Sequence, residues 1–257
     1  MRKTTNTVAL ALALLFFAIS AFAEQPTREF KGSFEPANTG ERLLSLLVSL
    51  TDPESMELRM DQQPDNDGNI RDFSIFIQGA SIGGFRVEKI AIESSFLELN
   101  RPSEWRTGER DSLKVRNVLR SNVELVALEK DINAALTSYA GGDWRRISVD
   151  LKKGMVSARG NYRSGSLDIL AEVSTKLEIR QGKQIWLKDT AIKINHDDQT
   201  DVIQKELEKI QPVVDIGQFP FPVTLAVLNV DEQKLVFSTR TLPKPVKGIF
   251  YRYVRGS

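Results

Sequence analysis

The 257-residue chain contains no cysteine and a single histidine, His196. Without cysteine there can be no disulfide and no thiolate metal site, so the fold must be held by packing alone. Common enzyme motifs are also missing, since no Gly-x-Ser-x-Gly elbow, Walker loop, His-Glu-x-x-His pair or dinucleotide fingerprint occurs. These absences predict a protein that is not an enzyme, with no catalytic residue, no metal and no cofactor.

An excess of charge of one sign is lacking as well. When Arg2 and Lys3 are removed with the N-terminal segment, the 35 basic residues fall to 33, against 34 acidic residues. Nucleic-acid binding requires a clearly basic face, because most of the affinity comes from contacts to phosphates. The charge balance therefore argues against a nucleic-acid partner.

The chain has one long apolar run, Val8 to Ile19, and no second run that could form a transmembrane helix. Basic residues precede this run, and Ala21-Phe22-Ala23 follows it as the small-x-small pattern that signal peptidases cleave. The run is short for an anchor, since spanning a bilayer takes about 20 apolar residues. We expect residues 1–23 to be a signal peptide and Glu24 to begin an exported, periplasmic or cell-envelope protein that is soluble after cleavage. An uncleaved membrane anchor is the alternative.

Three segments have apolar side chains at the three- and four-residue spacing of amphipathic helices. They cover roughly 40–50, 129–139 and 201–211, after a polar linker at 24–39. In the first helix the apolar face consists of Leu43, Leu44, Leu47 and Leu50.

The rest of residues 40–242 alternates apolar and polar side chains, which predicts strands joined by hairpins. The longest alternating stretch runs from Leu167 to Ile179, well beyond a typical strand of five or six residues. Changes in the alternation predict bulges between Val87 and Ile90 and near Thr190. We therefore predict one α+β domain, in which a long, curved antiparallel sheet is wrapped around or covered by about three helices.

Two acidic segments are candidate metal sites. Asp65 to Ile70 is similar to the middle of an EF-hand loop, but Gln63 and Ser74 occupy positions that need an aspartate and a bidentate glutamate, so a plain turn is favoured. His196-Asp197-Asp198, with Asp201 nearby, could bind a divalent cation or serve a hydrolase. The same acidic residues also suit the start of a helix, which is the favoured interpretation.

The last segment, 243–257, is basic and aromatic. Cationic side chains near an anionic surface and aromatic rings in the headgroup region both favour a membrane surface. The candidate membrane-surface residues are Lys244, Lys247, Phe250, Tyr251, Arg252 and Arg255. The alternative is an edge strand or a frayed terminus in which the charges are incidental.

The order of several segments resembles a known family. The segments are 131–136 (DINAAL), 147–160 (ISVDLKKGMVSARG), 219–225 (FPFPVTL), 229–231 (NVD) and 234–237 (KLVF). This order is similar to that of the LmeA-like family of exported phospholipid-binding proteins, from the first helix to about Arg240. The resemblance implies a periplasmic or envelope protein that binds phospholipid, with a curved sheet around a helix like that of tubular lipid-binding domains. It carries no residue motif for the lipid, and the tail after Pro243 departs from the family.

Two hypotheses follow. The first is a non-enzymatic phospholipid-binding protein of the cell envelope, a carrier or a sensor, that holds acyl chains in an apolar groove. The candidate lining residues are Leu167, Ile169, Val173, Leu177, Phe219 and Phe221. The second hypothesis is an interaction or scaffold module of envelope assembly whose sheet is closed by its own helices and which binds no ligand.

Overall fold

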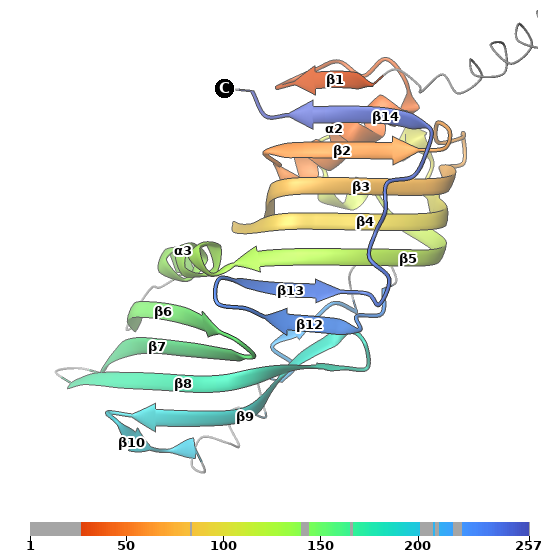
Figure 1. Ribbon diagram of the computed structural model, residues 1–257. Helices are drawn as coiled ribbons and strands as arrows, with labels where there is room; N and C mark the ends of the chain where they lie inside the picture. The colour runs from red at the N-terminus through yellow and green to blue at the C-terminus, as the bar shows by residue number, and fades with distance from the viewer. Residues whose placement is uncertain are drawn as a thin grey trace, which may run out of the picture.

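The computed structural model describes residues 27–82, 84–139, 144–164, 167–200, 208, 211–217 and 223–256. These residues form an eight-stranded sheet and a six-stranded sheet, stacked one beyond the other in Figure 1. Two α-helices accompany them, α2 (Thr39–Thr51) and α3 (Glu129–Tyr139). The prediction of an α+β protein rich in antiparallel strands is confirmed, but the described residues contain two α-helices rather than about three. The third predicted helix, 201–211, falls almost entirely outside the described residues.

The first sheet has the strand order β1-β14-β2-β3-β4-β5-β13-β12. Its strands are β1 (Arg28–Lys31), β2 (Ser55–Met60), β3 (Asn69–Ile82), β4 (Phe85–Leu99), β5 (Val115–Leu128), β12 (Val227–Val230), β13 (Lys234–Ser238) and β14 (Ile249–Val254). Two short 3-10 helices, Pro102–Glu104 and Arg110–Ser112, lie in the loop between β4 and β5. The sheet is antiparallel except where β1 pairs in parallel with β14.

The second sheet has the order β10-β9-β8-β7-β6, and β11 also pairs with β9. Its strands are β6 (Trp144–Lys152), β7 (Met155–Ser164), β8 (Leu167–Arg180), β9 (Gln184–Ile194), β10 (Asp197–Asp198) and β11 (Val214–Asp215). β8 is the long strand that the alternating pattern predicted. The register between β8 and β9 shifts between Ser174 and Lys176, which confirms the bulge predicted near Thr190.

The bulge predicted between Val87 and Ile90 is wrong. β3 and β4 stay in one register there, with Ala80 opposite Val87 and Ile77 opposite Ile90. The alternation nevertheless changes, because Gly79 adopts a φ of 61° in the facing strand. In both strands, the residues that face the core therefore switch from one alternating set to the other, although neither strand contains an extra residue.

A filled apolar core lies between α2 and the first sheet. Asn38 caps α2 by accepting a hydrogen bond from Glu41 N at 3.0 Å, and Leu43 and Leu44 are buried at the centre. Leu47 and Leu50 are partly buried against the same cluster, so the predicted apolar face of this helix is confirmed. The core also takes in Trp105, whose Nε1 donates to Asn100 O at 3.1 Å. The inner face of this part of the sheet is thus closed by the chain itself.

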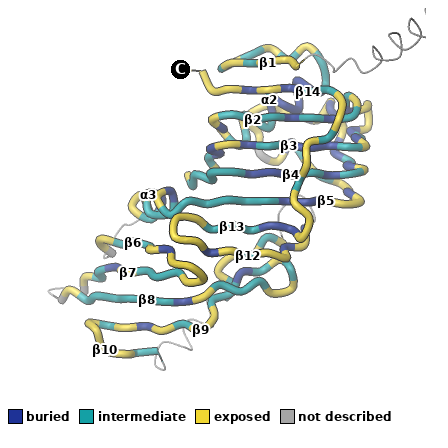
Figure 2. Tube along the Cα trace, in the orientation of Figure 1, coloured by how far each residue is buried: buried dark blue, intermediate teal, exposed yellow. Residues whose placement is uncertain are grey.

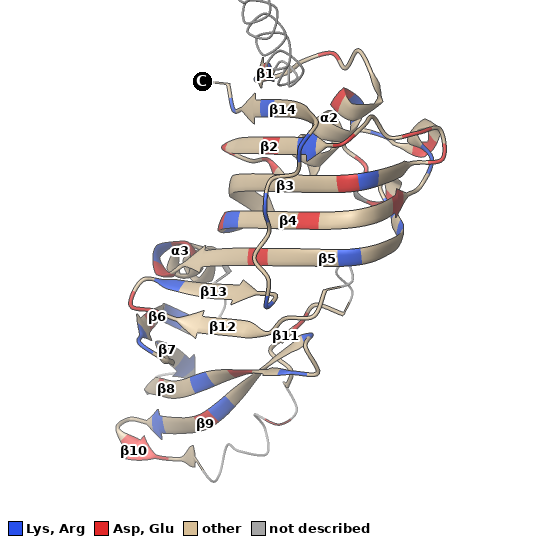
Figure 3. Ribbon diagram, turned by 45° about the vertical axis from the view of Figure 1, so that its right-hand side comes forward, with Lys and Arg blue, Asp and Glu red and all other residues tan. Residues whose placement is uncertain are grey.

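The C-terminal segment is integral to the first sheet. Residues 239–248 cross its outer face as a strap, visible in Figures 1 and 3, from β5 to β2. Along the strap, Thr239 N donates to Val123 O at 3.0 Å, Lys244 N to Glu93 Oε2 at 2.9 Å, and Val246 N to Ser74 Oγ at 3.1 Å. The chain then enters β14, between β1 and β2. The sequence placed β1 in a linker and β14 in a separate tail, whereas both are strands of the sheet.

Candidate lipid-binding face

One face of the second sheet is apolar across four strands. The register places Val149, Ala158, Val173 and Ile192 side by side in a single row. Further along the same face, Tyr162 pairs with Ile169 and Leu177 pairs with Leu187, and the buried Thr175 lies between Val173 and Leu177. Because side chains alternate between the two faces of a strand, every second residue of β8 contributes to this surface.

The apolar face is only half covered. Ile169, Val173 and Leu177 are each half-buried, in contrast to the leucines under α2, which are fully buried. At its margins the face is closed, since Leu151, Ile185 and Ile192 are 2–3% exposed. Figure 2 shows the same contrast, with half-buried strands in the second sheet and buried segments concentrated in the first. The centre of the face is thus apolar surface that the described residues do not fully cover.

The predicted groove residues divide into three groups. Ile169, Val173 and Leu177 lie on the one face, as their spacing indicated. Leu167 begins the same strand, but its side chain lies outside the described residues. Phe219 and Phe221 also lie outside them.

The opposite face of the second sheet is polar. Its central row consists of Ser148, Arg159, Glu172 and Lys193. Two hollows of about 660 and 550 Å³ share the first three of these residues, and the larger also borders Val149, Ala158 and Val173 of the apolar row. The three shared side chains are polar and do not suit acyl chains, because burying unpaired polar groups beside hydrocarbon is unfavourable.

His196 lies at the rim of the smaller hollow and is 77% exposed, with Nδ1 3.4 Å from Glu172 Oε2. Asp198 accepts hydrogen bonds from the hydroxyl and the backbone N–H of Thr200, at 2.6 and 2.9 Å, and the hydroxyl bond in particular lowers the pKa of this carboxyl. Asp201 lies outside the described residues. In the described part of the chain, no three His, Asp or Glu side chains are grouped as metal ligands.

We expect His196→Ala to change the free energy of unfolding by less than about 0.5 kcal/mol, because an exposed side chain with one loose partner contributes little. Urea unfolding of the variant beside the parent protein would measure this. A larger loss, or loss of lipid binding, would assign His196 a role in the site.

The EF-hand-like segment is a turn. Asp65 Oδ1 accepts hydrogen bonds from the backbone N–H groups of Asp67 and Asn69, both at 2.9 Å. The bond from Asn69 is the main cause that lowers the pKa of Asp65. Gly68 provides the required φ of 88°.

The structure places the predicted membrane-surface residues in different environments. Tyr251 is 1% exposed, and its hydroxyl donates to Asn38 Oδ1 at 3.1 Å and accepts from Gln63 Nε2 at 2.6 Å, so it is a core residue and not a surface residue. Phe250 lies beneath the guanidinium of Arg59, with the cation 3.8 Å from the ring centre.

The basic members of the set differ in their partners. Arg252 pairs with Glu29 at 3.4 Å, and Arg255 pairs with Asp52 at 3.1 Å. Lys244 and Lys247 are exposed on the strap. Sequence patterns could not separate these cases, because the alternation of β14 also fits a surface segment.

Two surfaces that matter to the site were missed by sequence reasoning. One is the inner face of the far end of the first sheet, where Leu125, Phe237 and Leu228 form a half-buried row across β5, β13 and β12. The other is the contact of α3, itself a predicted helix, with the edge of the second sheet. Asn133 Nδ2 donates to Val149 O at 2.8 Å, and Val149 N donates to Asn133 Oδ1 at 2.7 Å. Leu151 N donates to Glu129 Oε2 at 2.7 Å.

The chain is thus an α+β protein whose second sheet presents a half-covered apolar face. Residues 41–240 match the LmeA-like phospholipid-binding family, and the chain belongs to that family. The chain matches no curated protein and no solved structure. No helix in the described ranges is both long and apolar enough to cross a membrane.

Proposed function

We propose that this protein is a non-enzymatic phospholipid carrier or sensor of the cell envelope, and that it holds acyl chains against the apolar face of the second sheet. Membership of a phospholipid-binding family supports the ligand class. The observation that carries the choice of site is the half-covered row through Val173. The part of the first sheet that faces α2, by contrast, is already covered by that helix.

The energetics of such a site are adequate. One acyl chain of about 15 methylenes, at about 0.8 kcal/mol for each methylene removed from water, gains on the order of 12 kcal/mol before ordering costs. We propose that the groove continues onto the half-buried row of β5, β13 and β12. In support, Gly154 N, in the turn between β6 and β7, donates to Val230 O of β12 at 2.9 Å, so the two sheets meet there.

Native mass spectrometry of the protein purified from its own envelope fraction tests this function. We expect a mass increase that tandem analysis assigns to phospholipid. A protein that carries no lipid and gains none from vesicles would instead favour a scaffold module, for which the closed core of the first sheet is the supporting observation.

We propose that the protein is exported and that its signal peptide is cleaved after Ala23. N-terminal sequencing of the extracytoplasmic protein should begin at Glu24, because Ala21 and Ala23 flank Phe22 in the pattern that signal peptidases recognise. A chain recovered from the membrane with Met1 intact would contradict cleavage.

A further inference from the structure

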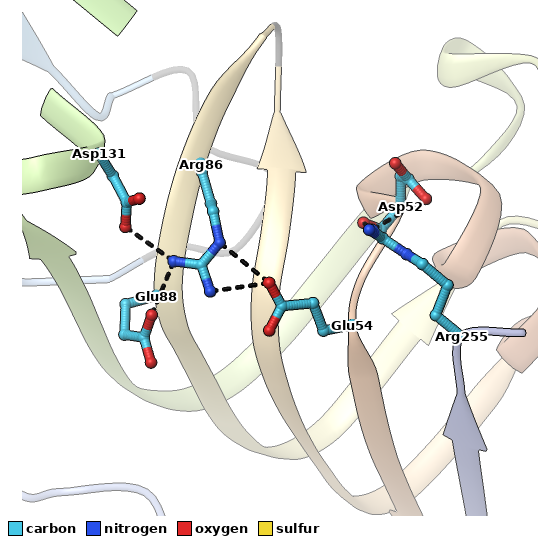
Figure 4. Close-up of polar contacts among 6 residues, drawn as sticks. All are labelled: Asp52, Glu54, Arg86, Glu88, Asp131 and Arg255. Atoms are coloured by element: carbon cyan, nitrogen blue, oxygen red, sulfur yellow. Dashed lines mark hydrogen bonds and ion pairs between the residues drawn. The ribbon is translucent and has the colours of Figure 1, made fainter. Parts of the chain in front are cut away.

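Arg86 lies at the junction between the first sheet and α3. It is the second residue of β4, and its guanidinium contacts three carboxylates from different parts of the chain (Figure 4). Its Nη1 lies 2.7 Å from Glu88 Oε2 and 2.7 Å from Asp131 Oδ2, and its Nη2 lies 2.9 Å from Glu54 Oε1. Glu54 precedes β2, and Asp131 is in the first turn of α3.

The surroundings hold this arrangement in place. Glu54 lies over Gly79, where any side chain would overlap the carboxyl group, and the positive φ of Gly79 suits glycine. The side chain of Asp131 is 10% exposed, so its charge is largely removed from water and needs the guanidinium beside it. The hydrogen bonds to Glu88 and then to Glu54 raise the pKa of Arg86.

α3 connects this group to the edge of the second sheet. Asp131 faces Arg86 of the first sheet, whereas Asn133 and Glu129 bind the backbone of β6. Since β6 is the edge strand of the second sheet and contributes Val149 to the apolar row, a change in the position of α3 would move that row relative to the first sheet. The polar contacts on α3 therefore join the two sheets through this helix, in addition to the direct contact between Gly154 and Val230.

We propose that Arg86 is a positioning residue that holds α3 against the first sheet and thereby aligns the apolar faces of the two sheets for lipid. The role in aligning the faces for lipid rests on the proposed function, but the role in holding α3 against the first sheet does not. Arg86 touches no residue of the apolar row, so it acts through Asp131 and α3.

The test uses the absence of native cysteine. Spin labels at Asn117→Cys in β5 and Ala191→Cys in β9, both exposed strand positions, report the separation of the two sheets by pulsed dipolar spectroscopy of the full mature chain without lipid. The parent should give one narrow distance distribution. Arg86→Gln should broaden or shift it, and Asp131→Asn, which neutralises only the carboxylate on α3, should do the same. The double variant should add nothing further, because either single change already disrupts the ion pair between Arg86 and Asp131 that holds α3.

Arg255→Gln is the matched control. Arg255 also pairs with a carboxylate, that of Asp52 at the C-terminal end of α2, but it makes no contact with α3 (Figure 4). Its distance distribution should equal that of the parent. Unchanged distances in Arg86→Gln and Asp131→Asn, with native far-UV circular dichroism, would overturn the proposal, as would equal broadening in Arg255→Gln.

Binding of a fluorescent phosphatidylglycerol then tests the link to lipid. Arg86→Gln should weaken binding about threefold or more, as is common for residues that act at a distance, and Arg255→Gln should not. Altered distances with unchanged lipid affinity would reject the alignment role. If the parent bound no lipid while Arg86→Gln still altered the distances, the proposed function would be rejected. The role of Arg86 in holding α3 against the first sheet would remain.

Discussion

A chain that ends at Pro243 should fail to fold. The truncation removes β14, the strand between β1 and β2, together with the buried rings of Tyr251 and Tyr253. Losing one large buried aromatic side chain alone costs about 3–5 kcal/mol, and a domain of this kind has only about 5–15 kcal/mol of stability in total. Far-UV circular dichroism and urea unfolding of the truncated protein should show no cooperative transition.

A chain that ends at Arg255 is the control. It keeps all of β14 and the hydrogen bond from Arg255 N to Glu54 O at 2.9 Å, so it should unfold like the full mature chain. If the chain ending at Pro243 unfolded cooperatively at the parent's urea midpoint, β14 would not be integral to the domain. Because truncation at Pro243 is expected to unfold the protein, a membrane-docking role of the strap is better tested by neutralising Lys244 and Lys247.

Val173→Asp should abolish phospholipid binding in a protein that still folds. Val173 lies at the centre of the apolar row, between Ala158 and Ile192, and is half-buried. A carboxylate there would either face acyl chains without a partner or draw water into the groove, and burying an unpaired charge is costly. We expect affinity for a fluorescent phospholipid to fall by about 100-fold or more, a loss of about 3 kcal/mol.

Ser174→Asp is the matched control, because it introduces the same charge one residue further along β8. Ser174 alternates with Val173 along β8 and therefore points to the polar face, where its hydroxyl lies 3.3 Å from that of Ser157. An aspartate there adds a charge to the polar face and not to the apolar row. This variant should bind lipid like the parent. If Val173→Asp bound equally well while folded, the face would not be the site. If only Val173→Asp unfolded, the row would be core, as the scaffold hypothesis requires.

Much of the fold could be predicted because periodicity reflects burial. The leucines of α2 and the apolar spacing of α3 specified both helices within a residue or two, and the alternation from Leu167 identified β8. What the pattern could not supply was strand order. Nothing local to Ile249–Val254 indicates that this segment pairs with β2, because that choice depends on contacts with residues far away in the chain.

The candidate site could also be predicted only in part, because the sequence pattern indicates which residues share a face but not what covers that face. Alternation placed Ile169, Val173 and Leu177 on one face, but it could not say whether a helix would cover that face, as α2 covers the first sheet. The polar junction at Arg86 gave no local signal at all. Its three carboxylates come from separate segments, and arginine beside glutamate in a strand is also an ordinary exposed pattern.

The position of β14 also governs when the protein can fold. Gln63 and Tyr251, which are bonded across the first sheet, are 188 residues apart, so the sheet cannot be completed until almost the whole chain is available. Until then β2 has a free edge, and an unpaired edge is a template for aggregation. Topologies with such distant pairings fold slowly, typically in milliseconds to seconds. We therefore expect the nascent chain to remain unfolded and dependent on chaperones until its last residues emerge.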